Sequence, residues 1–249
     1  KQTNLDFTKI NWALVVPLAN EEAEFDIFIH EIQKVLNAIG SGKVYLITDT
    51  VSKDRTTELC NELSQKDNRF VSVFAPENKN VVDAYIRGYK EAYKNNHEFI
   101  VEMDAGLSHD PNTLPEFLKA YKEGYECVFG SRFVKGGSMG NSPFKRRMLS
   151  YGGTFLSNIL LGTKLKDMTS GYQGFTHELV GKLVSYPLMS KAHFYQTEVR
   201  YLFRKYKWKE IPISYKAPSP RVSDKAIKNS IKVLWILFLK RLSFKPISL

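Results

Sequence analysis

The stretch EFIVEMDAGLSHDP, residues 98–111, decides the fold class of this 249-residue chain. An apolar run ends abruptly in an acid, Asp104, and small and polar residues and a proline follow. This pattern predicts a buried strand that delivers a carboxylate to the loop at its end. Two residues further on, where a second carboxylate would complete a pair, the chain has Gly106. The stretch is therefore either a metal and phosphate site that lacks one ligand, or only a strand end.

The same alternation of a short apolar run with a longer amphipathic segment recurs along the chain. Apolar runs occupy 13–17, 43–49, 70–76, 98–104 and 126–132, and amphipathic segments follow the first four at 21–39, 54–66, 80–95 and 111–124. Strands that alternate with helices, and that are apolar throughout, indicate a mostly parallel sheet covered on both faces. We therefore predict an α/β fold with a Rossmann-like, mostly parallel sheet flanked by helices.

Composition narrows the partners and the compartment. The net charge of +10 points to an anionic partner: nucleic acid, anionic lipid or a phosphorylated small molecule. Charge alone supports nucleic acid, and no nucleic-acid-binding motif accompanies it, so we expect no nucleic-acid partner. Cys60 and Cys127 lie in a predicted helix and a predicted strand, and we expect buried free thiols. No apolar run approaches the ~18 residues that span a bilayer, and no signal-peptide pattern is present. We expect a cytoplasmic protein, peripheral on the inner face of the membrane.

The strand ends predict where a ligand binds. In open parallel sheets the ligand lies at the carboxyl ends of the strands, and these ends are rich here in acids, amides and glycines. The plain alternative is that all loops are polar. It accounts less well for Asp49, Asp104 and Arg132, each of which falls at the end of an apolar run. The GxGxxG, GxxxxGK[ST] and GxSxG motifs are absent, which argues against a dinucleotide oxidoreductase, a P-loop nucleotidase and an α/β-hydrolase.

The order of these loops resembles the family 2 glycosyltransferases. PLANEE, TDTVSKDRT, MDAGLSHDP and GSRF follow the first, second, fourth and fifth predicted strands. Further on, the chain resembles the dolichyl- or polyprenyl-phosphate mannosyltransferase branch in RRMLSYGGTFLSNILL, DMTSGYQGF, FYQTEV and EIPISY. The resemblance covers about residues 14–225. It implies a GT-A domain over 1–222, with a nucleotide-sugar half over about 1–135 and an acceptor half over about 136–222.

The resemblance also implies the donor site. The donor would be a UDP- or GDP-linked sugar. Its expected contacts are Pro17, Ala19, Asn20, Glu21, Asp49, Asp104, Ala105 and Gly106. Asp104 matches the first acid of the family's DxD motif, and it would hold Mg²⁺ or Mn²⁺ against the diphosphate, where the cation stabilises the charge of the leaving group. Asp54 matches an acid that holds its own loop together, and a helix N-cap is an equal alternative.

The acceptor would be a polyprenyl phosphate or a saccharide. The resemblance implies that Arg132, Arg146, Arg147 and the position of Gln173 receive an acceptor phosphate, although the branch usually has arginine at 173. A hydroxyl acceptor needs a general base, for which we favour Asp167 and then Glu198, with Arg132 beside them. A phosphate acceptor is already anionic and needs only positioning. For His109 we favour a loop residue bonded to backbone over a metal ligand, and for Asp110 an N-cap is as plausible as a ligand.

The last segment, 223–249, is predicted as a basic amphipathic helix. Its cations lie between apolar residues at helical spacing, so the helix either rests in a membrane interface or packs on the domain. Two functions follow from the whole sequence. The first is an inverting glycosyltransferase acting at the cytoplasmic membrane surface. The alternative is a catalytically impaired relative that binds a nucleotide sugar or a partner protein, because the second DxD acid is absent at Gly106.

Overall fold

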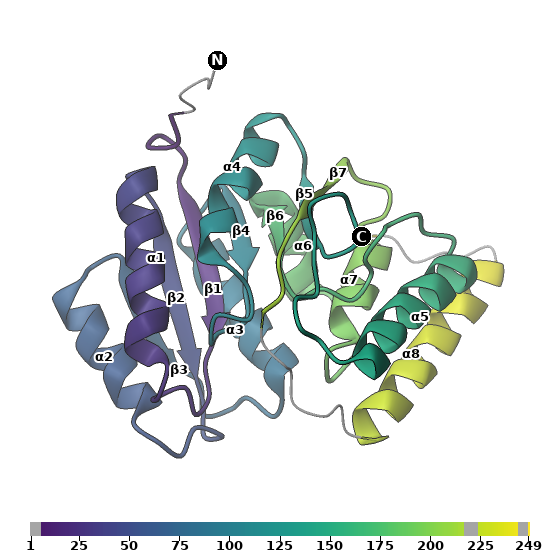
Figure 1. The fold of residues 1–249 in the computed structure, drawn as a ribbon, viewed down its shortest axis with the longest axis horizontal. Helices are drawn as coiled ribbons and strands as arrows, with labels where there is room; N and C mark the ends of the chain where they lie inside the picture. The colour runs from purple at the N-terminus through teal and green to yellow at the C-terminus, as the bar shows by residue number, and fades with distance from the viewer. Residues whose placement is uncertain (1–5, 217–223, 244–248) are drawn as a thin grey trace.

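The computed structural model describes residues 6–216, 224–243 and 249 (Figure 1). Residues 1–5 and 217–222 of the predicted domain lie outside the described residues, as do residues 223 and 244–248 of the predicted terminal helix. The described strands form one seven-stranded sheet in the order β3-β2-β1-β4-β6-β5-β7. They are β1 (Trp12–Pro17), β2 (Lys43–Thr48), β3 (Phe70–Phe74), β4 (Phe99–Glu102), β5 (Cys127–Ser131), β6 (Gln173–Thr176) and β7 (Trp208–Pro212).

Every neighbouring pair of strands is parallel except the two pairs that involve β6. The prediction of a mostly parallel sheet flanked by helices is confirmed. The helices are α1 (Phe25–Ile39), α2 (Thr56–Lys66), α3 (Val81–Lys94), α4 (Leu114–Lys122), α5 (Phe144–Leu161), α6 (His177–Ser185), α7 (Tyr195–Leu202) and α8 (Asp224–Leu242), with a 3₁₀ turn at Pro111–Thr113.

Strand β1 explains why both faces of the sheet are covered. Trp12, Leu14 and Val16 are buried against α1 and α4 on one face, and Ala13 and Val15 are buried in the core of α3, α6 and α7 on the other. Because successive side chains of a strand point to opposite faces, a strand that is apolar throughout needs a layer on each side. Cys60 and Cys127 are buried free thiols, as predicted.

The antiparallel strand β6 brings an extra loop to the site. Its first residue, Gln173, pairs with Glu102 at the carboxyl end of β4 and with Phe129 near the end of β5. The loop that precedes β6 therefore meets the loops that follow β1, β2, β4 and β5 at a single edge of the sheet. Beyond this edge α5 and α8 pack side by side and form a separate layer (Figure 1).

Candidate functional site

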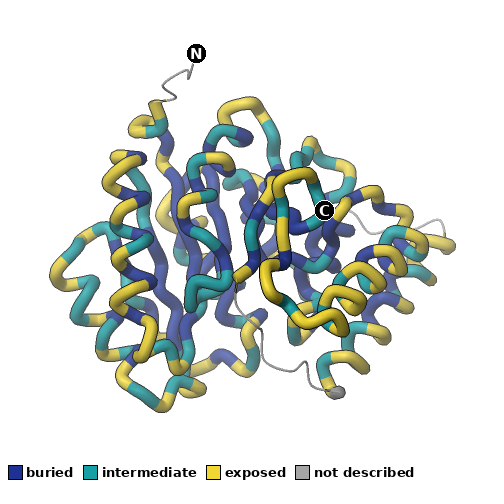
Figure 2. Tube along the Cα trace, in the orientation of Figure 1, coloured by how far each residue is buried: buried dark blue, intermediate teal, exposed yellow. Residues whose placement is uncertain are grey.

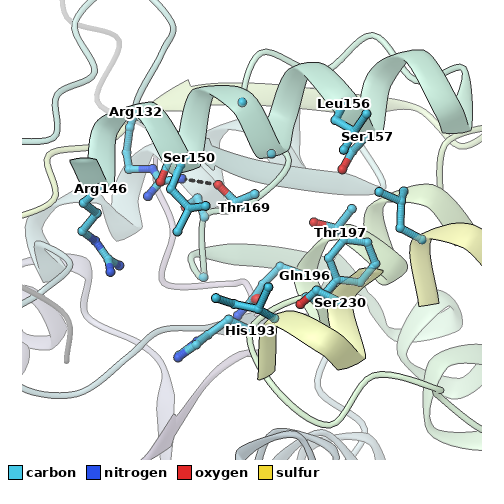
Figure 3. Close-up of a pocket in the computed structure, with 18 of the residues that line it drawn as sticks. Arg132, Arg146, Ser150, Leu156, Ser157, Thr169, His193, Gln196, Thr197 and Ser230 are labelled. Carbon is cyan, nitrogen blue, oxygen red and sulfur yellow. Dashed lines mark hydrogen bonds between the residues drawn. The ribbon is translucent and has the colours of Figure 1, made fainter. Parts of the chain in front are cut away.

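A cavity of about 450 Å³ lies between the carboxyl edge of the sheet and the helices α5 and α8 (Figure 3). Its lining is polar at the sheet edge, where it includes Asp104, His109, Arg132 and Arg146. It is apolar between the helices, where it includes Met148, Leu149, Leu156, Ile227, Ile231 and Leu234. Figure 3 shows Arg132 and Arg146 at one end and Leu156 toward the other. The cavity thus joins two cations to an apolar channel.

Asp104 lies just past β4 and reaches this cavity with a side chain that is 37% exposed. The hydroxyl of Tyr85, on α3, donates a hydrogen bond to its Oδ1. Burial, together with the nearby carboxylates of Asp104 and Glu102, raises the pKa of Tyr85 well above its ordinary value, so this phenol stays a donor. On the other side, Nδ1 of His109 lies 3.7 Å from Oδ2 of Asp104. The strand end therefore presents a carboxylate that is held but still accessible.

Carboxylates from another loop lie close to Gly106, where the second acid of the motif is absent. Gly106 has a φ of +72°, and a Cβ atom built on it would lie 3.0 Å from Oε2 of Glu21 and 3.4 Å from Oε2 of Glu24. Burial, and then the charges of Glu24, Asp54 and Asp104, raise the pKa of Glu21. The loop after β1 therefore places carboxylates where the second DxD acid would project.

The side chains at this edge of the sheet would hold a divalent cation only if phosphate and water oxygens completed its coordination shell. No three His, Cys, Asp or Glu side chains of the described chain are arranged to hold a metal ion by themselves. Mg²⁺ and Mn²⁺ take oxygen ligands and accept one or two carboxylates when phosphates and water complete the shell. Asp104 meets that need, and Glu21 is the acid beside it.

The loops after β1 and β2 are tied together by the polar residues that the motifs contain. The backbone N–H of Lys53 donates to Oδ1 of Asn20 at 2.8 Å. Asp54 accepts from the N–H of Thr56 at 3.0 Å, at the start of α2, and from the N–H of Glu22 at 3.0 Å. Asp54 thus links the two loops and accepts from the first N–H of α2, although the N-cap position itself is occupied by Arg55. Asp49 accepts from the N–H of Val51 at 2.9 Å within its own loop.

Arg132 and Asp167 form a buried ion pair. Nε and one terminal nitrogen of Arg132 donate to the two carboxylate oxygens at 2.7 and 2.8 Å, and the backbone N–H of Arg132 donates to Oδ2 at 3.0 Å. Burial alone would raise the pKa of Asp167, but the hydrogen bonds and charge of Arg132 outweigh it and lower that pKa to about 2. Arg132 also donates to Oγ1 of Thr169 at 2.6 Å, a contact drawn in Figure 3. The guanidinium lines the cavity, whereas Asp167 lies behind it.

A second buried network supports the loop that carries Asp167. Arg200, on α7, donates to the carbonyl oxygens of Asp167 and of Ser170, the latter at 2.8 Å, and its Nε donates to Oε1 of Gln173 at 3.3 Å. Gln173 in turn donates to Oε1 of Glu102 at 2.8 Å. Burial raises the pKa of Glu102 well above its ordinary value, which favours the protonated carboxyl in the fold. Burial also lowers the pKa of Arg200 to about 10, which leaves it charged.

The expected acceptor residues are only partly brought together. Arg132 and Arg146 line the cavity, whereas Arg147 is exposed and donates to the carbonyl of Gly140. Gln173 is buried in the network and does not line the cavity. Glu198 is fully buried and accepts from the N–H groups of Met189 and Ser190 at 2.9 and 2.8 Å. In this geometry neither Asp167 nor Glu198 is placed to take a proton from a group in the cavity.

The loop after β4 also contains Asp110 and His109, whose hydrogen bonding can be compared with the sequence expectations. Asp110 accepts from the N–H of Asn112 at 3.0 Å and caps the 3₁₀ turn, as one alternative predicted. His109 is buried between the rings of Tyr172 and Tyr215, and its Nδ1 has no hydrogen-bond partner in the part of the chain that the structure describes. The expected backbone bond is therefore not made by this nitrogen.

Some residues at the cavity were not identified from the sequence. Tyr215 lies under the guanidinium groups of Arg132 and Arg146, with ring-centre distances of 5.9 and 5.5 Å. Thr169 and Gln196 also line the cavity. Gln196 and Tyr215 belong to the motifs FYQTEV and EIPISY, which gave a signal for them, whereas nothing local in the sequence marks Tyr85.

The outer surface of α5 and α8 is apolar. Twelve of the seventeen exposed large hydrophobic side chains in the described residues lie on these two helices. They are Phe144, Met148, Leu149, Tyr151, Phe155, Leu156, Ile159, Ile227, Ile231, Trp235, Leu239 and Leu242, and we call them the apolar face. The exposed stretches of both helices are visible in Figure 2. Val233 and Leu237 of α8 are buried, so packing on the domain, one of the two alternatives, is confirmed for the opposite side of this helix. None of the described helices is both long and apolar enough to cross a membrane.

Known proteins resemble this chain in sequence and in fold. Residues 13–184 match the family model described as glycosyl transferase family 2. Polyprenol monophosphomannose synthase of Mycolicibacterium smegmatis is 28% identical over 205 residues, which cover 81% of this chain and 76% of that protein. Dolichol-phosphate mannosyltransferase of Pyrococcus furiosus is 34% identical over 170 residues, 68% of this chain but only about half (47%) of that protein.

Among solved structures, glucosyl-3-phosphoglycerate synthase from Mycobacterium tuberculosis, in complex with Mn²⁺, UDP and glucosyl-3-phosphoglycerate, superposes with a TM-score of 0.65. The match has 17% sequence identity and covers 94% of this chain and 80% of that one. At this identity the likeness concerns the fold, and it agrees with the GT-A architecture expected from the sequence.

Proposed function

Because this chain belongs to glycosyl transferase family 2, we propose that it transfers a sugar from a nucleotide diphosphate sugar to a polyprenyl phosphate at a membrane surface, with inversion of the anomeric centre. One observation carries the choice of acceptor: a single cavity joins Arg132 and Arg146 to an apolar channel between α5 and α8. A polyprenyl phosphate has the same two-part chemistry. The names of the two relatives reported above, a polyprenol monophosphomannose synthase and a dolichol-phosphate mannosyltransferase, support it.

The polar end of the cavity suits a phosphate. Arg146 has no carboxylate partner in the described part of the chain, and its Nε, though buried, has no hydrogen-bond partner there. Its guanidinium is held over Tyr215, with which it also makes a 3.5 Å contact. An arginine that is oriented yet unneutralised is well suited to bind phosphate oxygens. Arg132 adds a second positive charge whose direction is fixed by Asp167.

The apolar face suits the membrane that would hold such an acceptor. It borders the apolar channel, since Met148, Leu149, Leu156, Ile227 and Ile231 belong to both. The same two helices also carry exposed lysines and arginines, among them Lys145, Arg147, Lys225, Lys228, Lys232 and Lys240. Helices with an apolar face and flanking cations lie in the interface plane of anionic membranes. The lipid tail would then pass from the bilayer to the phosphate site without crossing water.

On the donor side, Asp104 and Glu21 would hold a divalent cation together with the diphosphate. The cation would stabilise the negative charge that the leaving nucleoside diphosphate acquires. The loops tied by Asn20 and Asp54 would carry the nucleotide beside it. Tyr85 fixes the direction of the Asp104 carboxylate.

A phosphate acceptor removes the need for a general base. Its oxygen is anionic at neutral pH and only has to be aligned with the anomeric carbon, and in-line attack inverts that centre. Asp167, with a pKa of about 2 and both oxygens bonded to Arg132, would be a poor base at pH 7. We therefore assign Asp167 the role of holding Arg132. Glu198 likewise holds the backbone of the loop before α7.

The test is a transfer assay with the full chain, UDP- or GDP-linked sugars, Mn²⁺ or Mg²⁺, and undecaprenyl phosphate in anionic vesicles. Arg146→Gln is expected to lower kcat/KM for the lipid at least tenfold, because a buried charge-assisted contact to phosphate is worth about 1.5–3 kcal/mol. Arg87→Gln is the control, since this side chain lies on α3, outside the cavity and outside α5 and α8, and its kcat/KM should change less than twofold.

Undecaprenol without the phosphate, and a soluble oligosaccharide, distinguish the acceptor classes. The proposal expects no transfer to either. Transfer to the oligosaccharide that is unaffected by Arg146→Gln would contradict the choice of a lipid phosphate and restore the saccharide alternative.

A further inference from the structure

Two buried side chains at the floor of the cavity, Gln196 and His109, each have one polar atom that forms no hydrogen bond within the residues that the structure describes. Gln196, on α7, is 3% exposed, and its Oε1 has no hydrogen-bond partner in the described part of the chain. His109 is 1% exposed, and the same holds for its Nδ1. Both side chains line the cavity, and Figure 3 shows Gln196 there. A buried polar atom without a partner costs about 1–3 kcal/mol, and native proteins hold few of them.

Both side chains surround the Asp104 carboxylate. Nδ1 of His109 lies 3.7 Å from Oδ2 of Asp104. A Cβ atom built on Gly171 would lie 3.1 Å from the same oxygen and 3.4 Å from Nε2 of Gln196. Glycine at 171 therefore lets the carboxylate and the amide approach each other over bare backbone. The three side chains come from the loop after β4 and from α7, and they form one polar floor.

We propose that Gln196 and His109 form the subsite that recognises hydroxyl groups of the transferred sugar. The inference rests on the proposed function and deepens it. Asp104 would lie at the diphosphate of the donor, and Arg132 and Arg146 at the acceptor phosphate. The sugar passes from one to the other and must lie between them. Gln196 and His109 line that same cavity directly beside Asp104.

The chemistry of the two side chains favours a hydroxyl over a second phosphate. The unpaired atom of Gln196 is an acceptor, which a phosphate oxygen cannot satisfy and a sugar hydroxyl can. The unpartnered Nδ1 of His109 can form one hydrogen bond with a hydroxyl group, and the adjacent Asp104 carboxylate repels a second anion.

The test compares the affinity of the wild-type chain and of each variant for a nucleoside diphosphate and for the matching nucleotide sugar. Binding of UDP and UDP-glucose, and of GDP and GDP-mannose, is measured by calorimetry with Mn²⁺, and the pair that the wild-type chain binds is used. Gln196→Leu is expected to raise the Kd of the nucleotide sugar at least tenfold and to change the Kd of the nucleoside diphosphate less than twofold. Its Tm should be unchanged or higher, because the substitution removes an unpaired buried acceptor.

Ser190→Ala is the matched control. Ser190 also has a buried hydroxyl without a partner in the described residues, but it lies outside the cavity. Its Tm should respond as that of Gln196→Leu does, while both Kd values stay within twofold of wild type. A purely structural role for Gln196 predicts the same behaviour for the two variants.

His109→Leu is the second variant, and it is expected to show the same selective loss. If a folded variant at either position changes both Kd values by the same factor, the sugar subsite is refuted while the proposed function stands. A wild-type protein that binds none of the four nucleotides overturns the proposed function itself, and the inference with it. The two failures therefore give different results.

Discussion

The buried pair of Arg132 and Asp167 allows a quantitative prediction for Asp167→Asn. The pKa of Asp167 falls from an ordinary 3.8 to about 2, and at about 1.4 kcal/mol per unit this corresponds to about 2–3 kcal/mol of folding free energy. Because the folded pKa is depressed, this contribution is present above pH 3.8 and is lost as the pH falls through about 2. Asparagine removes the charge but leaves the guanidinium buried and unpaired, which costs about 3–5 kcal/mol.

Urea unfolding of Asp167→Asn at pH 7 measures this loss. The double variant Arg132→Met with Asp167→Leu should recover most of it, because an apolar pair leaves no buried charge behind. Glu58→Gln is the control: its pair with Arg55 has both side chains more than half exposed, and the loss should be below about 0.5 kcal/mol. A loss below about 1 kcal/mol for Asp167→Asn would refute the structural role of the pair and revive the general base.

Three further predictions test the other parts of the site. Glu102→Gln should stabilise the chain at pH 7, because burial raises the folded pKa of Glu102 and the cost of ionising it grows as the pH rises above about 4.5. Urea unfolding against pH should therefore show a flatter fall in stability for the variant, and an unchanged profile would contradict a raised pKa for Glu102. Gly106→Asp should lower the free energy of unfolding by about 1–2 kcal/mol through its left-handed backbone and the nearby Glu21, and Mn²⁺ should restore the Tm of this variant but not of Gly106→Ala; equal responses to Mn²⁺ would argue against a cation at this edge. Replacing both Ile231 and Trp235 by serine should reduce co-sedimentation with anionic vesicles at least fivefold. Ile27→Ser, at a residue equally exposed on α1, should have no effect. Equal binding by the two variants would show that the apolar face does not meet the membrane.

The elements of the nucleotide-sugar half follow from the sequence because their side chains meet the core directly. The apolar positions of α1 that recur at helical spacing, such as Phe28 and Ile32, are buried in the structure, whereas Ile27, outside that spacing, is exposed. The five predicted strands are present, because short apolar runs bounded by polar residues leave little choice. Strand β6, QGFT, escaped prediction: it has four residues, one of them glycine, and no apolar period marks its antiparallel insertion between β4 and β5.

Within the site, the sequence indicates where the chain turns toward a ligand more readily than what each side chain does there. Asp104 and Arg132 were expected at the cavity from their place after apolar runs, and both line it. The role of Asp167 depends on Arg132, which lies 35 residues away in the chain, and only folding brings the two into a bidentate pair. An acid in a motif looks the same whether it faces a substrate or an arginine.

The glutamine at 173 shows why a departure from a family motif has to be judged with its neighbours in space. The β4–β6 register places Gln173 opposite Glu102, and the amide bonds to that buried carboxyl instead of facing the cavity. The positive charge that this position lacks is present on Arg200, which bonds to Gln173 and to the backbone of Asp167 and Ser170. An arginine at 173 would place two guanidinium groups in one fully buried network with a single acid between them, which carries a high desolvation cost. Gln173 and Arg200 therefore form a matched pair. Glutamine at position 173 therefore leaves the buried charge of Arg200 without a competing guanidinium group, and Arg200 can hold the loop beside the cavity.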